Sequence, residues 1–157
     1  MPKLAIFPMS FTDLPSVLEI EEQSFPEPWS RALFRRELIN PISFSFIGKV
    51  EHEGELRLVS YIVFWLVAGE GHILNVAVHP DFRNRGFARE LTSFAMATMG
   101  EMGAQDLFLE VRVTNAAAIH LYESLGFREI GVRKGYYASG EDAKVMYYGM
   151  TPFEDEC

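Results

Sequence analysis

Two hydrophobic patterns alternate along this chain of 157 residues, and their order constrains its fold more than any other feature. Segments rich in β-branched and aromatic residues predict strands, whereas apolar residues three or four positions apart predict helices. The predicted strands are Leu4–Phe7, Ser43–Val50, Leu56–Val67, His72–Val78, Leu107–Val111, Phe127–Val132 and Val145–Met150. The predicted helices are one that follows Asp13 and ends at Ser24–Trp29, and then Ser30–Leu38, Gly86–Met99 and Ala116–Leu125. This order predicts an α/β domain built on a mixed sheet.

Three polar residues precede predicted helices at the position where a side chain can cap the first free amides. They are Asp13, Ser30 and Asn115, and Asn115 is matched by Gly126 just past the end of its helix. Because a capping oxygen accepts a hydrogen bond from an amide of the first turn, each is expected to fix where its helix begins.

Length, charge and cysteine content narrow the class of protein. A chain of this length predicts a single domain over residues 1–157, with a core large enough to need no disulfide. The formal net charge of −8 argues against nucleic acid as the main ligand, because it repels phosphate backbones. The single cysteine, Cys157, excludes an intrachain disulfide and suits a reducing compartment. The longest apolar stretch, Tyr61–Ala68, is too short to span a membrane, and the N-terminus has no signal-peptide pattern, so a cytoplasmic, soluble protein is expected.

The segment His79–Arg89 joins a predicted strand to a predicted helix and combines glycine with positive charge. Gly86 allows close approach of a ligand to the main chain, and the first amides of the following helix favour an anion. Arg83, Arg85 and Arg89 add positive charge to an acidic chain. The segment therefore predicts a diphosphate cradle, although it matches neither a dinucleotide fingerprint nor a P-loop. The alternative is a loop whose arginines point into solvent.

Three polar residues in the second half of the chain could carry chemistry, and each also has a structural interpretation. Glu110 lies on an apolar strand, either as an edge residue facing water or as a partly desolvated acid with a raised pKa. Taken alone, the edge interpretation is favoured. The position of Tyr122 on a helix beside leucines is more typical of a core tyrosine with a solvated hydroxyl than of a catalytic acid. Asn115 is more typical of a helix cap than of a ligand contact.

Together these segments resemble the GNAT N-acetyltransferase superfamily over residues 76–127. The family motif R/Q-x-x-G-x-G/A stands here as Arg83-x-x-Gly86-x-Ala88. The chain is most similar to the RimI-type branch, the bacterial N-terminal alanine acetyltransferases of ribosomal protein. The segments that carry this resemblance are Phe25–Ser30, Asn75–Val78, Leu109–Arg112, Asn115–Ala118, Leu121–Phe127 and Tyr136–Tyr137.

The resemblance implies the GNAT fold, a mixed and mostly antiparallel sheet of about seven strands flanked by about four helices. It also implies acetyl-CoA as cosubstrate and a protein or peptide N-terminus as acceptor, with the N-terminal alanine of a small-subunit ribosomal protein as the expected target. Glu110 would be the general base and Tyr122 the general acid. The residues implied to bind the cofactor are Val76, Ala77 and Val78 through their backbone, Arg83, Asn84, Arg85, Gly86, Phe87, Ala88 and Arg89 at the diphosphate, and Asn115.

Two other functions compete with this one. The first is acetylation of lysine side chains or of a small amine, and the second is a non-catalytic module that only binds acetyl-CoA. The presence of both Glu110 and Tyr122 argues against the module. The segments Phe25–Ser30 and Tyr136–Tyr137 favour a peptide acceptor over a small amine, because Trp29 and the two tyrosines would wall a groove if the family arrangement holds.

The amine chemistry favours an α-amino acceptor. An α-amino group has a pKa of about 7.7–8.0, so roughly a tenth of it is neutral at pH 7, whereas a lysine amine has a pKa of about 10.4. A glutamate with a raised pKa can serve the first of these, directly or through a water. No metal is expected, because the four histidines, His52, His72, His79 and His120, show no metal-ligand spacing.

Overall fold

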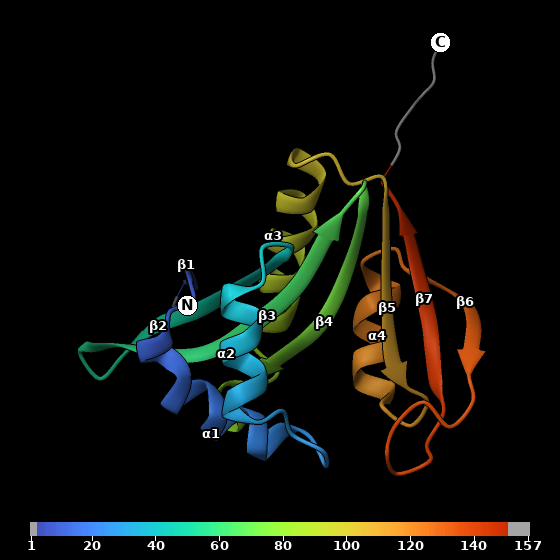
Figure 1. Cartoon of the computed structure of the whole chain (residues 1–157). Coiled ribbons are helices and arrows are strands. Elements are labelled where there is room, and N and C mark those ends of the chain that lie inside the picture. The colour runs from blue at the N-terminus through green and yellow to red at the C-terminus, as the bar shows by residue number, and fades with distance from the viewer. Residues whose placement is uncertain (1–2, 151–157) are drawn as a thin grey trace.

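The computed structural model describes residues 3–150, which build one seven-stranded sheet in the order β1-β2-β3-β4-β5-β7-β6 (Figure 1). The strands are β1 (Ala5–Pro8), β2 (Ser43–His52), β3 (Glu55–Val67), β4 (Glu70–Val78), β5 (Asp106–Arg112), β6 (Arg128–Arg133) and β7 (Ala143–Gly149). The β4–β5 pair is parallel and all other neighbours are antiparallel. The predicted mixed, mostly antiparallel sheet is confirmed. Cys157, the single cysteine, lies outside the described residues.

Within the part of the chain that the structure describes, four α-helices accompany the sheet, as predicted. They are α1 (Leu14–Ser24), α2 (Arg31–Ile39), α3 (Phe87–Glu101) and α4 (Ala116–Ser124). Ser30 and Asn115 cap α2 and α4, because each side-chain oxygen accepts an amide hydrogen bond of 3.1 Å. The prediction that the Asp13 side chain caps α1 is wrong. Its carboxylate instead accepts the Ser10 amide at 2.8 Å and closes a short 3-10 turn, Phe11–Asp13, that precedes the helix.

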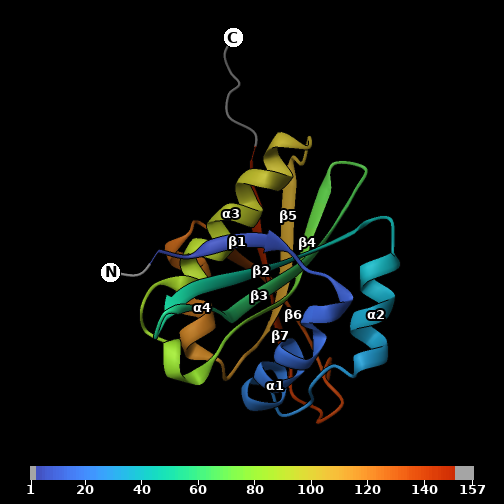
Figure 2. The ribbon, with the colours of Figure 1, turned by 90° about the vertical axis from the view of Figure 1, so that its left-hand side faces the viewer.

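The helices cover both faces of the sheet, so the core has two parts (Figures 1 and 2). On one face, α1 and α2 bury apolar residues such as Leu14 and Phe34 against Tyr61 of β3. On the other, α3 buries Leu91 and Met99 in a larger cluster that also contains Tyr122 of α4. No helix among residues 3–150 is both long and apolar enough to cross a membrane.

Strands β4 and β5 pair only over their first halves and then separate. Their pairing runs from Glu70 opposite Asp106 to Ile73 opposite Leu109. At that point β4 contains a bulge, because Ile73 and Asn75 pair with consecutive residues of β3 and Leu74 is extra. A bulge bends its strand, and β4 curves away from β5 (Figure 1). Within the described part of the chain, the second half of β4 therefore has no strand beside it on that edge.

Candidate active site

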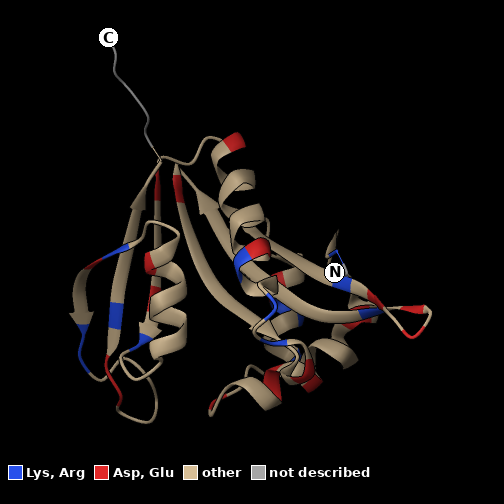
Figure 3. Ribbon diagram, turned by 180° about the vertical axis from the view of Figure 1, so that it is seen from behind, with Lys and Arg blue, Asp and Glu red and all other residues tan. Residues whose placement is uncertain are grey.

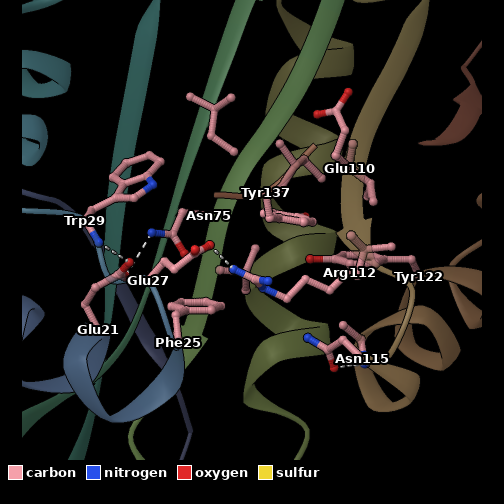
Figure 4. A pocket seen from close by; sticks show the side chains of 16 residues that line it. Glu21, Phe25, Glu27, Trp29, Asn75, Glu110, Arg112, Asn115, Tyr122 and Tyr137 are labelled. Carbon is pink, nitrogen blue, oxygen red and sulfur yellow. Dashed lines mark hydrogen bonds and ion pairs between the residues drawn. The ribbon is translucent and has the colours of Figure 1, made fainter. Parts of the chain in front are cut away.

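Two adjacent grooves open where β4 and β5 separate. The first, called here the α3 groove, is lined by Ser24, Phe25, Val76, Ala77, Val78, Phe82, Arg83, Asn84, Gly86, Phe87, Ala88, Arg89, Asn115, Ala117, Ala118, Leu121 and Tyr122. The second, the α1 groove, is lined by Glu21, Phe25, Glu27, Trp29, Ile73, Leu74, Asn75, Val76, Leu109, Glu110, Val111, Arg112, Asn115, Ala118, Tyr122 and Tyr137 (Figure 4). Every residue predicted from the sequence as catalytic or cofactor-binding, except Arg85, lines at least one of them.

The start of helix α3 presents main-chain donors to the α3 groove. Gly86 has φ +84°, and a Cβ built on it would have no protein atom within 4 Å. Asn84 is also left-handed, with φ +63°. The first helical hydrogen bond of α3 runs from the Glu90 amide to the Gly86 carbonyl at 3.0 Å, so the three preceding amides have no acceptor within the helix. Such a turn followed by free amides suits an anionic group.

Two of the three arginines of this segment link the elements that surround the α3 groove. Arg83 donates from Nε to the Val78 carbonyl at 2.9 Å and from Nη2 to Ser24 Oγ at 3.0 Å, which ties the end of β4 to α1. Arg89 donates to Ser124 at the end of α4 and so links α3 to α4. Arg85 does not line either groove, because it donates to the Asp81 carbonyl and lies over the ring of Phe82, 5.0 Å from its centroid. Elsewhere, acidic and basic residues both occur on many elements (Figure 3).

The two grooves meet at five shared residues, namely Phe25, Val76, Asn115, Ala118 and Tyr122. Tyr122 is 8% exposed, and burial raises the pKa of its hydroxyl. The group therefore remains a protonated phenol at neutral pH, able to donate one hydrogen bond at the junction. The structure thus combines both interpretations of Tyr122, since the ring packs in the core while the residue lines both grooves.

Glu110 follows the last residue of β5 that pairs with β4, and on the other side it pairs with Val145 of β7. Its side chain is only 10% exposed, so the interpretation as an edge residue facing water is wrong. Its Oε1 lies 2.7 Å from Nε2 of His72, and its Oε2 lies 3.6 Å from Nε of Arg133. The expected raised pKa is also wrong. Burial alone would raise the pKa of Glu110, but the hydrogen bond and charge of His72, with the charge of Arg133, outweigh burial and lower it.

A second buried carboxylate, Glu21 of α1, organises the floor of the α1 groove. It is 1% exposed and accepts a hydrogen bond from the Tyr61 hydroxyl at 2.6 Å. It also accepts hydrogen bonds from Asn75 Nδ2 at 2.9 Å and from the Trp29 amide at 3.0 Å (Figure 4). These contacts fix the segment between α1 and α2 against β3 and β4. A buried carboxylate needs hydrogen-bond donors, and the donors that Glu21 finds fix the position of Trp29 at one side of the α1 groove.

Arg112, at the end of β5, joins the two segments that border the α1 groove. It donates to Glu27 at 2.6 Å, and its guanidinium lies 4.0 Å from the ring centroid of Tyr137 (Figure 4). It also donates to Glu141 at 3.0 Å. Trp29 and Tyr137 line this groove as expected. Tyr136 does not, because it is 48% exposed and packs edge-on against Tyr137 from outside.

The sequence did not indicate His72, Glu21 or Arg112 as parts of this site. Each acts through a partner far away in the chain, so no local spacing marks them, and only correct strand pairing would have placed His72 beside Glu110. His120 is exposed on α4, as predicted. Within residues 3–150, no three His, Cys, Asp or Glu side chains are arranged as metal ligands.

Comparison with known proteins agrees with this geometry. The family model described as "Acetyltransferase (GNAT) family" matches residues 14–127. The chain is 36% identical to the "[Ribosomal protein bS18]-alanine N-acetyltransferase" of Salmonella typhimurium, covering 88% of this chain and 92% of that protein. It is 32% identical to the "N-alpha-acetyltransferase" of Sulfurisphaera tokodaii, covering 86% of each.

A solved structure supports the same assignment. The crystal structure of the ribosomal-protein-S18-alanine N-acetyltransferase from Escherichia coli aligns with a TM-score of 0.84 and 32% identity, covering 99% of both chains. The fold and family expected from the sequence are therefore confirmed. The chain belongs to the acetyltransferase (GNAT) family, in its RimI-type branch, and is an acetyl-CoA-dependent N-acetyltransferase.

Proposed function

We propose that this N-terminal protein acetyltransferase acts on the N-terminal alanine of ribosomal protein bS18, with Glu110 and Tyr122 as its catalytic residues. The observation that carries the proposal is the junction of the two grooves. Tyr122 lies where they meet, and Glu110 lines the α1 groove, which offers a place for a peptide. The names of relatives at 36% and 32% identity support a protein N-terminus as the acceptor.

The α3 groove suits acetyl-CoA, which supplies an activated acetyl thioester. The second half of β4 has a free edge, so the backbone of Val76, Ala77 and Val78 can pair with the amide groups of the pantetheine arm as an added strand would. Asn84, Gly86, Phe87, Ala88 and Arg89 would hold the diphosphate, with Arg83 and Arg85 shaping the loop, and Asn115 would contact the cofactor where the grooves meet.

The acceptor amine must lose a proton as it forms the new N–C bond. Glu110 would take this proton, directly or through a water, while the Tyr122 hydroxyl donates to the sulfur as the C–S bond breaks. Burial keeps Tyr122 protonated, which suits this role. The chain needs no covalent intermediate, because the amine itself attacks the thioester.

The lowered pKa of Glu110 favours an α-amine over a lysine as the acceptor. A carboxylate with a lowered pKa is a weak base, so it helps only an amine that is already partly neutral. The gap of about 2.5 pKa units between the two amines corresponds to about 3.4 kcal/mol of deprotonation. Lysine side chains therefore make poor acceptors at this site.

The direct test offers acetyl-CoA and two matched peptides that contain one lysine each. One begins with a free alanine, and its twin has a blocked N-terminus. We expect tandem mass spectrometry to place the acetyl group on the free α-amine, and the blocked twin to react far more slowly. Equal labelling of lysine in the blocked peptide would instead assign the enzyme to side-chain acetylation. Intact-mass comparison of ribosomal proteins from cells with and without the gene then tests bS18 itself.

A further inference from the structure

Asn75 of β4 is a buried amide whose two ends have different surroundings. The residue is 7% exposed, and its Nδ2 donates to Oε1 of Glu21 at 2.9 Å. Its Oδ1 accepts no hydrogen bond from any residue between positions 3 and 150. The buried side-chain atoms of this range that lack both a partner and contact with solvent are the hydroxyls of Ser43, Ser60 and Thr92. Oδ1 is not among them, so it is open to the space that Asn75 lines, the α1 groove.

Glu21 decides which end of this amide faces the groove. An ionised carboxylate only accepts hydrogen bonds, whereas an asparagine amide has one donor end and one acceptor end. Glu21 also accepts from the Trp29 amide and the Tyr61 hydroxyl, so all three groups around it are donors. Burial, and then the charge of Glu21, raise the pKa of the Tyr61 hydroxyl, so Tyr61 keeps the proton that it donates. The NH2 end of Asn75 is therefore held on Glu21, and its oxygen is turned away from Glu21 (Figure 4).

This oxygen lies on the same side of the sheet as the proposed base. Leu109 and Val111 belong to the core beneath α3, so Glu110 between them faces the α1 side. Ala77 belongs to the core on the α1 side, and Asn75, two residues earlier, faces the same way. Glu110 directly follows the last residue of β5 that pairs with β4, and Asn75 directly follows the bulge of β4. The two side chains therefore flank the opening between the separating strands.

We propose that Asn75 Oδ1 binds the α-amino group of the acceptor, by accepting an N–H that the nitrogen keeps throughout the reaction. This inference rests on the proposed function. A neutral alanine amine has two N–H bonds. As the N–C bond forms and the C–S bond breaks, one proton passes to Glu110, the sulfur takes a proton from Tyr122, and the second N–H remains in the product amide. Asn75 accepts that second N–H and so turns the nitrogen lone pair toward the acetyl group.

An amide oxygen suits this role better than another carboxylate. It accepts a hydrogen bond without taking the proton, so Asn75 does not compete with Glu110 as a base. Because Glu21 already holds the amide, the oxygen is in place before the acceptor arrives, which lowers the ordering cost of binding. In this arrangement Asn75 contacts the substrate, and Glu21 is a positioning residue that acts through Asn75.

The variant Asn75→Leu keeps the approximate size and branching of the side chain and removes its oxygen. We expect kcat/KM for the alanine peptide to fall about tenfold, the effect of losing one hydrogen bond, with unchanged affinity for acetyl-CoA. Calorimetry on enzyme loaded with coenzyme A should show the Kd of the alanine peptide rising by a similar factor. Thermal unfolding checks that the variant is folded. Wild-type kcat/KM in folded Asn75→Leu would overturn the proposal.

A peptide that begins with N-methylalanine separates this contact from a purely structural role. Its neutral amine has one N–H bond, and that proton is the one lost, so no N–H remains for Asn75. We expect the wild type to prefer alanine over N-methylalanine about tenfold more strongly than Asn75→Leu does. The steric cost of the methyl group cancels in this comparison, because both enzymes bear it. Equal preferences in the two enzymes would overturn the proposal even if Asn75→Leu is slower.

Glu21→Gln should reverse the Asn75 amide from behind, and it also tests the proposal if Asn75→Leu does not fold. The Trp29 amide can only donate, so it keeps the glutamine oxygen at the place of Oε2 and leaves the new NH2 beside Asn75. Asn75 then turns its oxygen toward that NH2 and its own NH2 into the groove, against the N–H bonds of the acceptor. We expect kcat/KM for the alanine peptide to fall at least as far as in Asn75→Leu, and the double variant to lose little more. Fully multiplicative losses would overturn the proposal.

Glu37→Gln is the matched control for Glu21→Gln. Glu37 of α2 is also a buried carboxylate, 6% exposed, that accepts from a tryptophan, the Trp65 indole at 2.6 Å, but it lines neither groove. This variant should keep wild-type kcat and KM. Failure of the proposed function gives a different pattern, since the unmodified enzyme then acetylates neither the alanine nor the N-methylalanine peptide, which overturns the function and the contact built on it. A wild type that acetylates alanine with the same preference as Asn75→Leu overturns the contact alone.

Discussion

The α3 groove and the α1 groove adjoin each other but are built from different material. Most residues that line the α3 groove come from residues 76–89, which run from the second half of β4 to the start of α3. The α1 groove presents side chains from α1, β4, β5 and the segment between β6 and β7. Of its charged residues, Arg112 pairs with Glu27 across the groove, and Glu110 pairs with His72, which does not line the groove. One groove is therefore specified locally, whereas the other depends on the whole fold.

The largest effect is expected for Glu110→Gln. If the chemistry of the α1 groove depends on side chains, replacing this one should remove most of the turnover. We expect kcat to fall by about 10²- to 10⁴-fold while acetyl-CoA binding is unchanged. Raising the pH should restore part of the rate, because more acceptor amine is then neutral. In the wild type, Glu110 should stay ionised to below the usual carboxyl range, so acid inhibition in steady-state kinetics should report other groups.

Glu123→Gln is the matched control for this variant, because Glu123 is exposed on α4 and lines neither groove. Its kcat should equal that of the wild type. Wild-type turnover in Glu110→Gln would mean that the α1 groove contains no base at this position.

The α3 groove should instead lose its ligand when the main-chain geometry at Gly86 is changed. Gly86→Val should raise the dissociation constant of coenzyme A about 100-fold, because a branched Cβ would stand beside the amide donors and strain a left-handed residue. Calorimetry measures this loss. Gly54→Val is the matched control, since Gly54 has φ +85°, equally open space and a position in the β2–β3 turn. It should show similar strain in thermal unfolding yet bind coenzyme A normally.

The smallest effect is expected for Arg112, whose side chain shapes the α1 groove without taking part in the proposed proton transfer. Arg112→Gln breaks the contacts to Glu27 and Glu141, so the two bordering segments lose their common anchor. We expect KM for the peptide to rise about fivefold, corresponding to about 1 kcal/mol, with kcat nearly unchanged. Arg128→Gln, on β6, is the control and should change neither constant. A fall in kcat without a change in KM would give Arg112 a chemical role.

The same contrast explains what the sequence could predict. The order of all strands and helices was predicted, because alternation and helical spacing are local, and most boundaries differ by only a few residues. The turn at Gly86 between a strand and a helix was also predicted, because it too is marked by a local pattern. Glu110 was identified as a candidate base, but its hydrogen-bond partner and the direction of its pKa shift were not predicted. Its partner His72 is 38 positions away, and Arg112 reaches Glu27 across 85 positions, so the pKa of Glu110 depends on pairing that no short pattern records.

The bulge at Leu74 has a consequence for how β4 can vary. Before it, the odd-numbered Ile73 belongs to the core beneath α3, but after it the odd-numbered Asn75 and Ala77 face α1, while Val78 belongs to the α3 side. The extra residue therefore inverts the phase of the strand at the point where the grooves begin. Deleting one residue here would exchange the two faces, sending the polar Asn75 into the apolar core and separating it from its carboxylate partner. The length of β4 is therefore constrained by the two faces that it serves.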